Sequence, residues 1–378
     1  MNWVFQKNQR AGHYHQRRGG LLQRIHIDIT LLILLLSLSS IGLLILMSSG
    51  QDDIGLLERQ ITRLSIAFFA MLIVAQIPPH VLKMFAPWLF LLGTLLLLGV
   101  LFMGDIGKGA QRWLDVGFFK FQPSELLKLA TPMMVAWYLA ERRLPPSIKH
   151  IAFATIFIAI PTVLIAKQPD LGTAILIASS GLAVLFLAGI SWRIIGGVIV
   201  AIGGLAPVLW SLMKEYQKQR VLTFLNPEDD PLGAGYHIIQ SKIAIGSGGI
   251  NGKGWMNGSQ ARLEFLPESS TDFIFAVFSE EFGLIGCIGL LTIYLLIFFR
   301  AIYISIQAQD TFSRLLAGSL SLTFFIYLLV NVGMVTGILP VVGVPLPLVS
   351  YGGTSMVTLL IGFGILMSIH THRKLLTP

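Results

Sequence analysis

"ITLLILLLSLSSIGLLILM", residues 29–47, is a run of nineteen residues without an ionisable side chain, and it decides the class of fold. A helix needs about 20 apolar residues to cross the roughly 30 Å hydrocarbon core of a bilayer. Similar runs recur along the 378-residue chain, which is 54% hydrophobic and only 12% charged. Since globular domains carry about 25% charged residues, the sequence predicts an all-α polytopic membrane protein.

The apolar runs predict ten transmembrane helices and two long connections. The connection between the third and fourth helices covers 104–121, and the one between the seventh and eighth helices covers 213–271. The single cysteine, Cys287, excludes a disulfide within the chain and argues against a thiolate metal site. The predicted helices cover residues 28–48, 62–78, 84–103, 122–141, 150–167, 171–189, 193–212, 272–299, 311–337 and 351–369.

The basic residues predict how the chain is oriented in the membrane. The N-terminal segment 1–27 and the C-terminal tail 370–378 are both basic, and cytoplasmic segments of membrane proteins are rich in Lys and Arg. Both termini are therefore expected in the cytoplasm, with the membrane domain 28–369 between them and the 213–271 loop on the outer, periplasmic face. The net charge of +8 is scattered between apolar runs, which indicates contact with anionic membrane lipid rather than nucleic acid.

"FLPESSTDFIFA", residues 265–276, places Asp272 at the start of an apolar run. Asp272 is either a helix cap or a general base that takes a proton from a hydroxyl group. Glu280 follows eight residues later, about 80° around an ideal helix, so both carboxylates can face one polar cavity. Acidic residues within a membrane segment, including the adjacent Glu281, are candidates for function.

"FQPSELLKLA", residues 121–130, contains Glu125 and Lys128 three positions apart, a spacing that lets the two side chains pair on one helix face. Glu125 is alternatively a helix-capping residue, because it occupies the third position after Pro123. Lys128 lies one turn inside the predicted membrane segment, where a cation could meet a phosphate.

Two further motifs carry polar residues to the same predicted face. In "KQPDLGTA", residues 167–174, Asp170 is either a helix cap or a site residue, and Lys167 either reaches water or binds an anion. In "RWLDVG", residues 112–117, Trp113 is either an interfacial aromatic or a sugar-stacking platform beside Arg112. Arg59 and Arg63 are expected to anchor the second helix at the membrane interface.

Nucleotide and zinc chemistry find no support in the large loop. Gly252-Lys253 lacks the spacing and the following Ser or Thr of a phosphate-binding loop. His237 has no second histidine at a metal-binding spacing.

Five motifs in their order along the chain resemble the SEDS family (shape, elongation, division and sporulation), from the first helix to the last. The resemblance implies a peptidoglycan glycosyltransferase with ten transmembrane helices that polymerises lipid II at the outer face of the inner membrane. It also implies a class B penicillin-binding protein as transpeptidase partner, within the elongation complex. The motifs are "FQPSELLKLA", "QPDLGTA", "GYHIIQSKIAIGSGGINGKG", "FLPESSTDFIFAVFSEEFGLIG" and "PLPLVSYGGTSM".

The resemblance assigns the family's essential aspartate to Asp272, which would deprotonate the 4-hydroxyl of the acceptor sugar. Many relatives carry Arg-His before Thr-Asp, whereas this chain has Ser269-Ser270, so the role of a basic partner there is open. The leaving undecaprenyl pyrophosphate needs cations, and the sequence leaves open a divalent ion, Mg²⁺ or Mn²⁺. The binding candidates are Arg112, Trp113, Glu125, Lys128, Lys167, Asp170, Arg220, Arg262 and Ser350, and the supporting candidates are Arg59, Glu268, Glu280 and Glu281.

Three other functions compete with elongation-specific polymerisation. A lipid II flippase would need polar residues through the depth of the bundle, whereas ionisable residues here crowd the outer half. A non-catalytic scaffold for the penicillin-binding protein would leave the Glu, Lys and Asp of the membrane segments unexplained. The division-specific member of the family shares the same chemistry.

Overall fold

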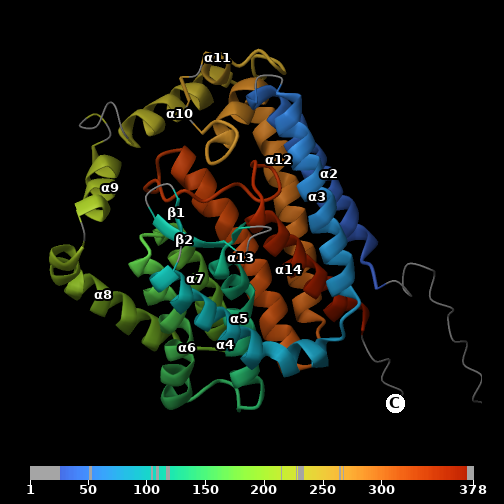
Figure 1. The fold of residues 1–378 in the computed structure, drawn as a ribbon, viewed down its shortest axis with the longest axis vertical. Coiled ribbons are helices and arrows are strands. Elements are labelled where there is room, and N and C mark those ends of the chain that lie inside the picture. The colour runs from blue at the N-terminus through green and yellow to red at the C-terminus, as the bar shows by residue number, and fades with distance from the viewer. Residues whose placement is uncertain are drawn as a thin grey trace, which may run out of the picture.

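Thirteen α-helices and a small three-stranded sheet form the described part of the chain (Figure 1). The computed structural model describes residues 26–50, 53–103, 105–107, 110–115, 120–213, 215–226, 228, 234–263, 265–266 and 268–372. Most of the predicted terminal segments, 1–27 and 370–378, therefore lie outside the described residues.

Six of the described helices are both long and apolar enough to cross a membrane: α2, α4, α6, α12, α13 and α14. The other predicted spans fall on α3, α5, α7 and α8, so each predicted range overlaps a helix. The helices on these ranges are α2 (Ile29–Ser49), α3 (Ile54–Ala75), α4 (Pro79–Met103), α5 (Pro123–Ala140), α6 (Ile148–Lys167), α7 (Leu171–Leu187), α8 (Trp192–Leu212), α12 (Ile274–Ile306), α13 (Thr311–Val335) and α14 (Thr354–Thr371).

The N-terminus of α3 lies two turns earlier than predicted. The Asp53 side chain caps the helix by accepting a hydrogen bond of 3.2 Å from the Leu56 N–H. The prediction missed the first turns of α3 because charged residues there interrupt the apolar pattern on which it depended.

The two connections that were predicted as loops contain regular structure. Residues 104–121 form the antiparallel strands β1 (Asp105–Gly107), β2 (Ala110–Asp115) and β3 (Lys120–Phe121), so the fold is not purely α-helical. Residues 213–271 contain α9 (Glu215–Leu225), α10 (Ala234–Gly248) and α11 (Ser259–Arg262). In Figure 1, α9 lies at the left between α8 and α10, and α10 and α11 lie at the top, at one end of the bundle.

Helix α12 is broken at Gly283, whereas the sequence predicted one continuous helix over 272–299. Gly283 has φ 62° and ψ −162°, a backbone conformation that lies outside the helical region. The break separates a nine-residue half-helix, 274–282, from the long segment that continues to Ile306. In an apolar environment each backbone group freed by such a break needs a new partner.

The chain before α11 supplies those partners. The N–H groups of Lys253 and Gly254 donate to the carbonyl groups of Glu280 and Glu281, at 3.0 and 2.9 Å. In return, the N–H groups of Leu284 and Ile285 donate to the carbonyl groups at positions 249 and 250, at 2.9 and 3.2 Å. Residues 249–254 are therefore inserted into the break as part of its hydrogen-bond network.

Glycine is required at this insertion because the two backbones touch. A Cβ atom at Gly283 would lie 2.3 Å from the Gly252 nitrogen, and one at Gly252 would lie 2.1 Å from the Glu281 carbonyl oxygen. Both residues also have positive φ angles, 62° and 77°, which glycine adopts without steric cost.

At the opposite end of the bundle, Asp28 joins α2, α12 and α14. Arg300 Nη2 lies 2.6 Å and His370 Nδ1 2.8 Å from Asp28 Oδ2, while the Leu31 N–H donates to Oδ1 at 2.9 Å. Burial alone would raise the pKa of Asp28, but the hydrogen bonds from His370, Arg300 and the Leu31 N–H outweigh it and hold that pKa well below its usual range. His370 lies near the C-terminal end of α14, and Asp28 lies at the start of α2. Because these two residues are in contact, both ends of the described chain lie on one side of the bundle.

Replacing Asp28 by Asn should lower the thermal unfolding midpoint in detergent by several degrees. Breaking a buried ion pair by removing one partner typically costs about 3–5 kcal/mol, and the partial exposure of Arg300 favours the lower end. Since the folded-state pKa of Asp28 lies below the unfolded value of about 4, its contribution is complete above that pH and is lost as the pH falls through the folded pKa. The difference between wild type and variant should therefore be present at pH 7 and shrink below about pH 4; a difference that grows in acid would contradict this assignment.

Candidate functional site

A polar cavity of about 250 Å³ lies between β2, α5, α7, α13 and the segment that leads into α14. Five of the predicted site residues line it: Arg112, Trp113, Glu125, Lys128 and Asp170. Clefts that bury a drug-sized ligand measure roughly 300–1,000 Å³, so this space suits one charged portion of a larger substrate.

Two ion pairs form the charged wall of the cavity. Lys128 Nζ lies 2.8 Å from Glu125 Oε1, so the pairing predicted from their spacing is present, and both side chains are buried. Arg112 Nε lies 3.4 Å from Asp170 Oδ2. Asp170 lines the cavity and also caps α7 by accepting a hydrogen bond from the Thr173 N–H. Two cationic side chains, Lys128 and Arg112, thus line the cavity, and each is paired with a carboxylate.

Asp272 lies at the edge of this cavity. A Cβ atom added to Gly343, which lines the cavity, would stand 3.4 Å from Asp272 Oδ2. The N-cap residue of α12 is Phe273, which makes no side-chain capping hydrogen bond, and Asp272 lies one residue before it. Asn331 of α13 donates to the Asp272 carbonyl group at 2.8 Å and fixes the backbone at this point.

Ser350 lies next to Asp272 in space but supports the backbone rather than lining the cavity. Its hydroxyl donates to the Thr271 carbonyl oxygen at 2.5 Å and accepts from the Leu346 N–H at 2.8 Å. The Tyr351 N–H also donates to the Ser270 carbonyl oxygen at 2.8 Å. The motif around Ser350 therefore holds the segment that carries Asp272.

Several predicted residues lie away from the cavity. Lys167 is exposed at the last turn of α6, and Arg262 is exposed in α11. Arg59 pairs with Asp53 at 3.5 Å on an exposed surface. Glu268 accepts a hydrogen bond of 2.7 Å from Thr271 Oγ1 in the turn before α12.

The prediction for Arg220 falls partly outside the described structure. Arg220 belongs to α9, but its side chain is outside the part of the chain that the structure describes.

The expectation that Glu280 and Asp272 face one cavity is wrong. Glu280 is fully buried against the 253–260 segment, where Lys253 Nζ lies 2.6 Å from Oε1. Glu281 is buried too and accepts a hydrogen bond from Ser48 Oγ of α2. The helical-wheel argument failed because Asp272 precedes α12, so the two residues do not share one helix.

The sequence also failed to indicate three residues of the site. Tyr327 and Gln122 line the cavity, and the Lys128 ammonium lies 5.7 Å from the centre of the Tyr327 ring. Arg63, which resembles a membrane-interface anchor in sequence, stacks over the Tyr351 ring at 4.7 Å and lies beside Gly353 of the cavity. Only the fold brings these distant segments together.

The cavity residues do not fit a resident divalent cation. Glu125 and Asp170 are its acidic lining residues, and each is already paired with a cation. Among the described residues, no group of three His, Cys, Asp or Glu side chains could hold a metal ion. The described residues thus offer no ready-made set of protein ligands for the Mg²⁺ or Mn²⁺ that the sequence left open.

These features define an integral membrane protein of apolar helices with a charge-lined cavity at one end of the bundle. The sequence profile of the FtsW/RodA/SpoVE cell cycle proteins matches residues 22–375. The chain belongs to this family, so the predicted membership is confirmed.

Relatives of known name cover almost the whole chain. It is 54% identical over 355 residues to the peptidoglycan glycosyltransferase MrdB of Escherichia coli K12, an alignment that spans 94% of this chain and 96% of that protein. Identity to the probable peptidoglycan glycosyltransferase FtsW of Geobacter metallireducens is 36%, over 92% of this chain and 95% of that protein. The sequence is therefore more similar to MrdB than to this FtsW.

Solved structures share the fold. A chain of a peptidoglycan synthase complex that coordinates polymerization and crosslinking superimposes with a TM-score of 0.80 at 30% identity, covering 91% of this chain and 97% of that one. The crystal structure of the rod shape determining protein RodA of Thermus thermophilus gives a TM-score of 0.69 at 26% identity, covering 92% and 98%.

Replacing Lys128 by Met should destabilise the protein more than replacing Lys128 and Glu125 together by Met and Gln. The single change leaves a buried carboxylate without its cation, at a typical cost of about 3–5 kcal/mol, whereas the double change removes both charges. Thermal midpoints of wild type, both single variants and the double variant give the coupling between the two residues. Additive losses would show that the pair does not act as a unit.

Proposed function

We propose that this chain is a peptidoglycan glycosyltransferase that polymerises lipid II into β-1,4-linked glycan strands during cell elongation. The named activity of MrdB, at 54% identity over nearly the full length of both proteins, supports the reaction class. The observation that carries the assignment to a site is the position of Asp272 at the edge of a cavity lined by Arg112 and Lys128.

In the proposed mechanism, Asp272 accepts the proton of the 4-hydroxyl group of the acceptor sugar. The oxygen then attacks the anomeric carbon of the donor sugar, and the bond from that carbon to the diphosphate breaks with inversion. The leaving group is undecaprenyl diphosphate, which carries away the bonding electron pair. A carboxylate is suited to this role because it can receive the proton while the new bond forms.

Cationic side chains would stabilise the charge that develops on the diphosphate. Lys128 and Arg112 line the cavity, and Arg63 approaches it beside Gly353. Both lining cations pair with carboxylates of the cavity wall. We propose that they turn part of their hydrogen bonding toward the diphosphate when lipid II binds.

We also propose how the chain is oriented in the membrane. Ten helices cross the inner membrane, both termini lie in the cytoplasm, and α9 to α11 lie on the periplasmic face with the cavity. The basic N-terminal segment and the common side of the two chain ends support this orientation.

Membrane lipid surrounds the bundle. The partner is a class B penicillin-binding protein of the elongation complex, which would crosslink the strands; the fold shared with a chain of a peptidoglycan synthase complex supports this.

Replacing Asp272 by Asn should lower the rate of glycan polymerisation by about 10²–10⁴-fold, the usual contribution of a positioned general base. Binding of lipid II should stay within a few-fold of wild type, because Asn keeps the shape of the side chain and the lining cations remain. The measurement is the formation of glycan polymer from lipid II by the purified chain, with its transpeptidase partner carrying an inactivated transpeptidase site.

Two outcomes would contradict the proposal. Polymer formed at the wild-type rate by Asp272→Asn would remove the proposed base. Movement of lipid II across vesicle membranes by a chain that forms no polymer, even with its partner, would favour the flippase.

A further inference from the structure

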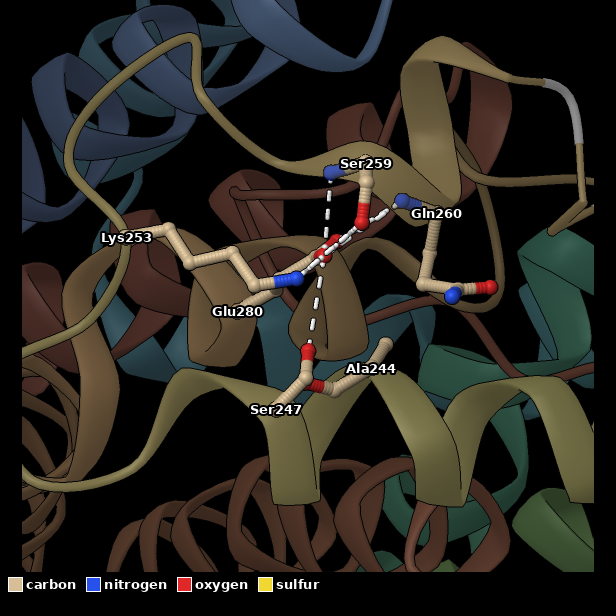
Figure 2. Close-up of polar contacts among 6 residues, drawn as sticks. All are labelled: Ala244, Ser247, Lys253, Ser259, Gln260 and Glu280. Atoms are coloured by element: carbon tan, nitrogen blue, oxygen red, sulfur yellow. Dashed lines mark hydrogen bonds and ion pairs between the residues drawn. The ribbon is translucent and has the colours of Figure 1, made fainter.

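We infer that Glu280 is a positioning residue for Asp272, acting through the half-helix 274–282. This inference rests on the proposed function and adds to it a residue outside the cavity. Glu280 belongs to a polar cluster, defined here as Ser247, Lys253, Ser259, Gln260 and Glu280, that joins the half-helix to the chain before it (Figure 2).

The Glu280 carboxylate is saturated with donors. Oε1 accepts hydrogen bonds from Lys253 Nζ at 2.6 Å and from both the N–H and the hydroxyl of Ser259 at 2.9 Å, with Ser247 Oγ at 3.4 Å. Oε2 accepts from the Gln260 N–H at 3.1 Å. These donors come from α10, from the 253–258 connection and from α11, and they converge on the carboxylate in Figure 2. One fully buried side chain thereby fixes three consecutive segments to the half-helix.

The break at Gly283 makes this connection necessary. In an unbroken helix, the N–H groups of Leu284 and Ile285 would bond to Glu280 and Glu281 and hold the first half in line. Here those groups bond to residues 249 and 250 instead. The inserted segment therefore provides a hydrogen-bonded link between the two halves of α12, and Glu280 binds that segment.

The other end of the half-helix is fixed independently. Asn331 and Ser350 hold the carbonyl groups of Asp272 and Thr271, at 2.8 and 2.5 Å. The half-helix, whose residues 274–281 are buried, is thus held by hydrogen bonds at both of its ends as well as by packing. If the support at Glu280 is lost, the half-helix can turn about its anchored end and change the direction of the Asp272 carboxylate.

A general base is sensitive to such a change. Catalytic groups act productively within about 0.5 Å and 10–20° of the right geometry. Misplacement by about 1 Å can cost about 10²-fold in rate. The cavity residues Arg112 and Lys128 lie on other elements and are held by their own ion pairs, so lipid II should still bind.

The test compares Glu280→Ala and Glu280→Gln with Asp28→Asn as a matched control. Asp28 is an equally buried carboxylate with an ion pair of the same 2.6 Å length, but it lies at the opposite end of the bundle. The full chain with its inactivated transpeptidase partner polymerises lipid II, and kcat is expressed per molecule that binds fluorescent lipid II. Hydrogen–deuterium exchange of residues 268–276 is measured on the same samples.

Glu280→Ala should lower kcat by about 10- to 100-fold with the KM for lipid II within about twofold of wild type. Glu280→Gln should lose less, because its amide oxygen still accepts from Ser259. Exchange at 268–276 should rise in Glu280→Ala. Asp28→Asn should lower thermal stability alone, with kcat per binding molecule and exchange at 268–276 unchanged.

The inference would be overturned if Glu280→Ala kept kcat within about twofold of wild type, or if it lowered kcat only as much as Asp28→Asn does. Unchanged exchange at 268–276 would also overturn it. A wild-type chain that binds lipid II and forms no polymer would instead refute the proposed function, while the exchange experiment would still test the link between Glu280 and the Asp272 segment.

Discussion

A helix in an apolar environment cannot be interrupted unless its freed backbone groups find partners, and this constraint organises the end of the bundle where α10 and α11 meet α12. Helix α12 breaks at Gly283, and residues 249–254 provide the missing donors and acceptors. The break turns the first part of α12 into a separate half-helix whose direction is set by the chain before it. Because Asp272 lies two residues before that half-helix, the placement of its carboxylate depends on the hydrogen bonds at the other end of the half-helix.

Buried charged side chains also need partners, because an unpaired ion in a low-dielectric interior costs several kcal/mol. Four carboxylates with buried side chains pair with cations in the described part of the chain. One of these ion pairs lies at the end of the bundle where the described chain begins and ends, and the other three lie at the opposite end. The opposite end thus concentrates polar chemistry, while the middle of the bundle is packed with apolar side chains. This asymmetry suits a reaction carried out at one membrane surface. The four pairs are Asp28–Arg300, Glu125–Lys128, Asp170–Arg112 and Glu280–Lys253.

The sequence was informative wherever a local pattern was enough. Apolar runs located the helices, and the three-residue spacing predicted the pairing of Glu125 with Lys128. Features set by contacts distant in sequence were not predictable. Gly283 is one of several glycines in its apolar run, and its approach to Gly252 and its positive φ angle distinguish it from Gly286 and Gly289 only in the folded chain. The role of Glu280 was mistaken for the same reason, because a helical wheel assumes the continuity that the break removes.

The central claim is that the side chain of residue 272 faces a cavity that opens to the outer surface and receives lipid II. Since Cys287 is the only cysteine, a Cys287→Ala chain carrying Asp272→Cys has one thiol, at the position in question. In sealed vesicles of known orientation, a membrane-impermeant maleimide should label this thiol from the periplasmic side only, and added lipid II should protect it. Labelling from the cytoplasmic side, or labelling that lipid II leaves unchanged, would contradict the account.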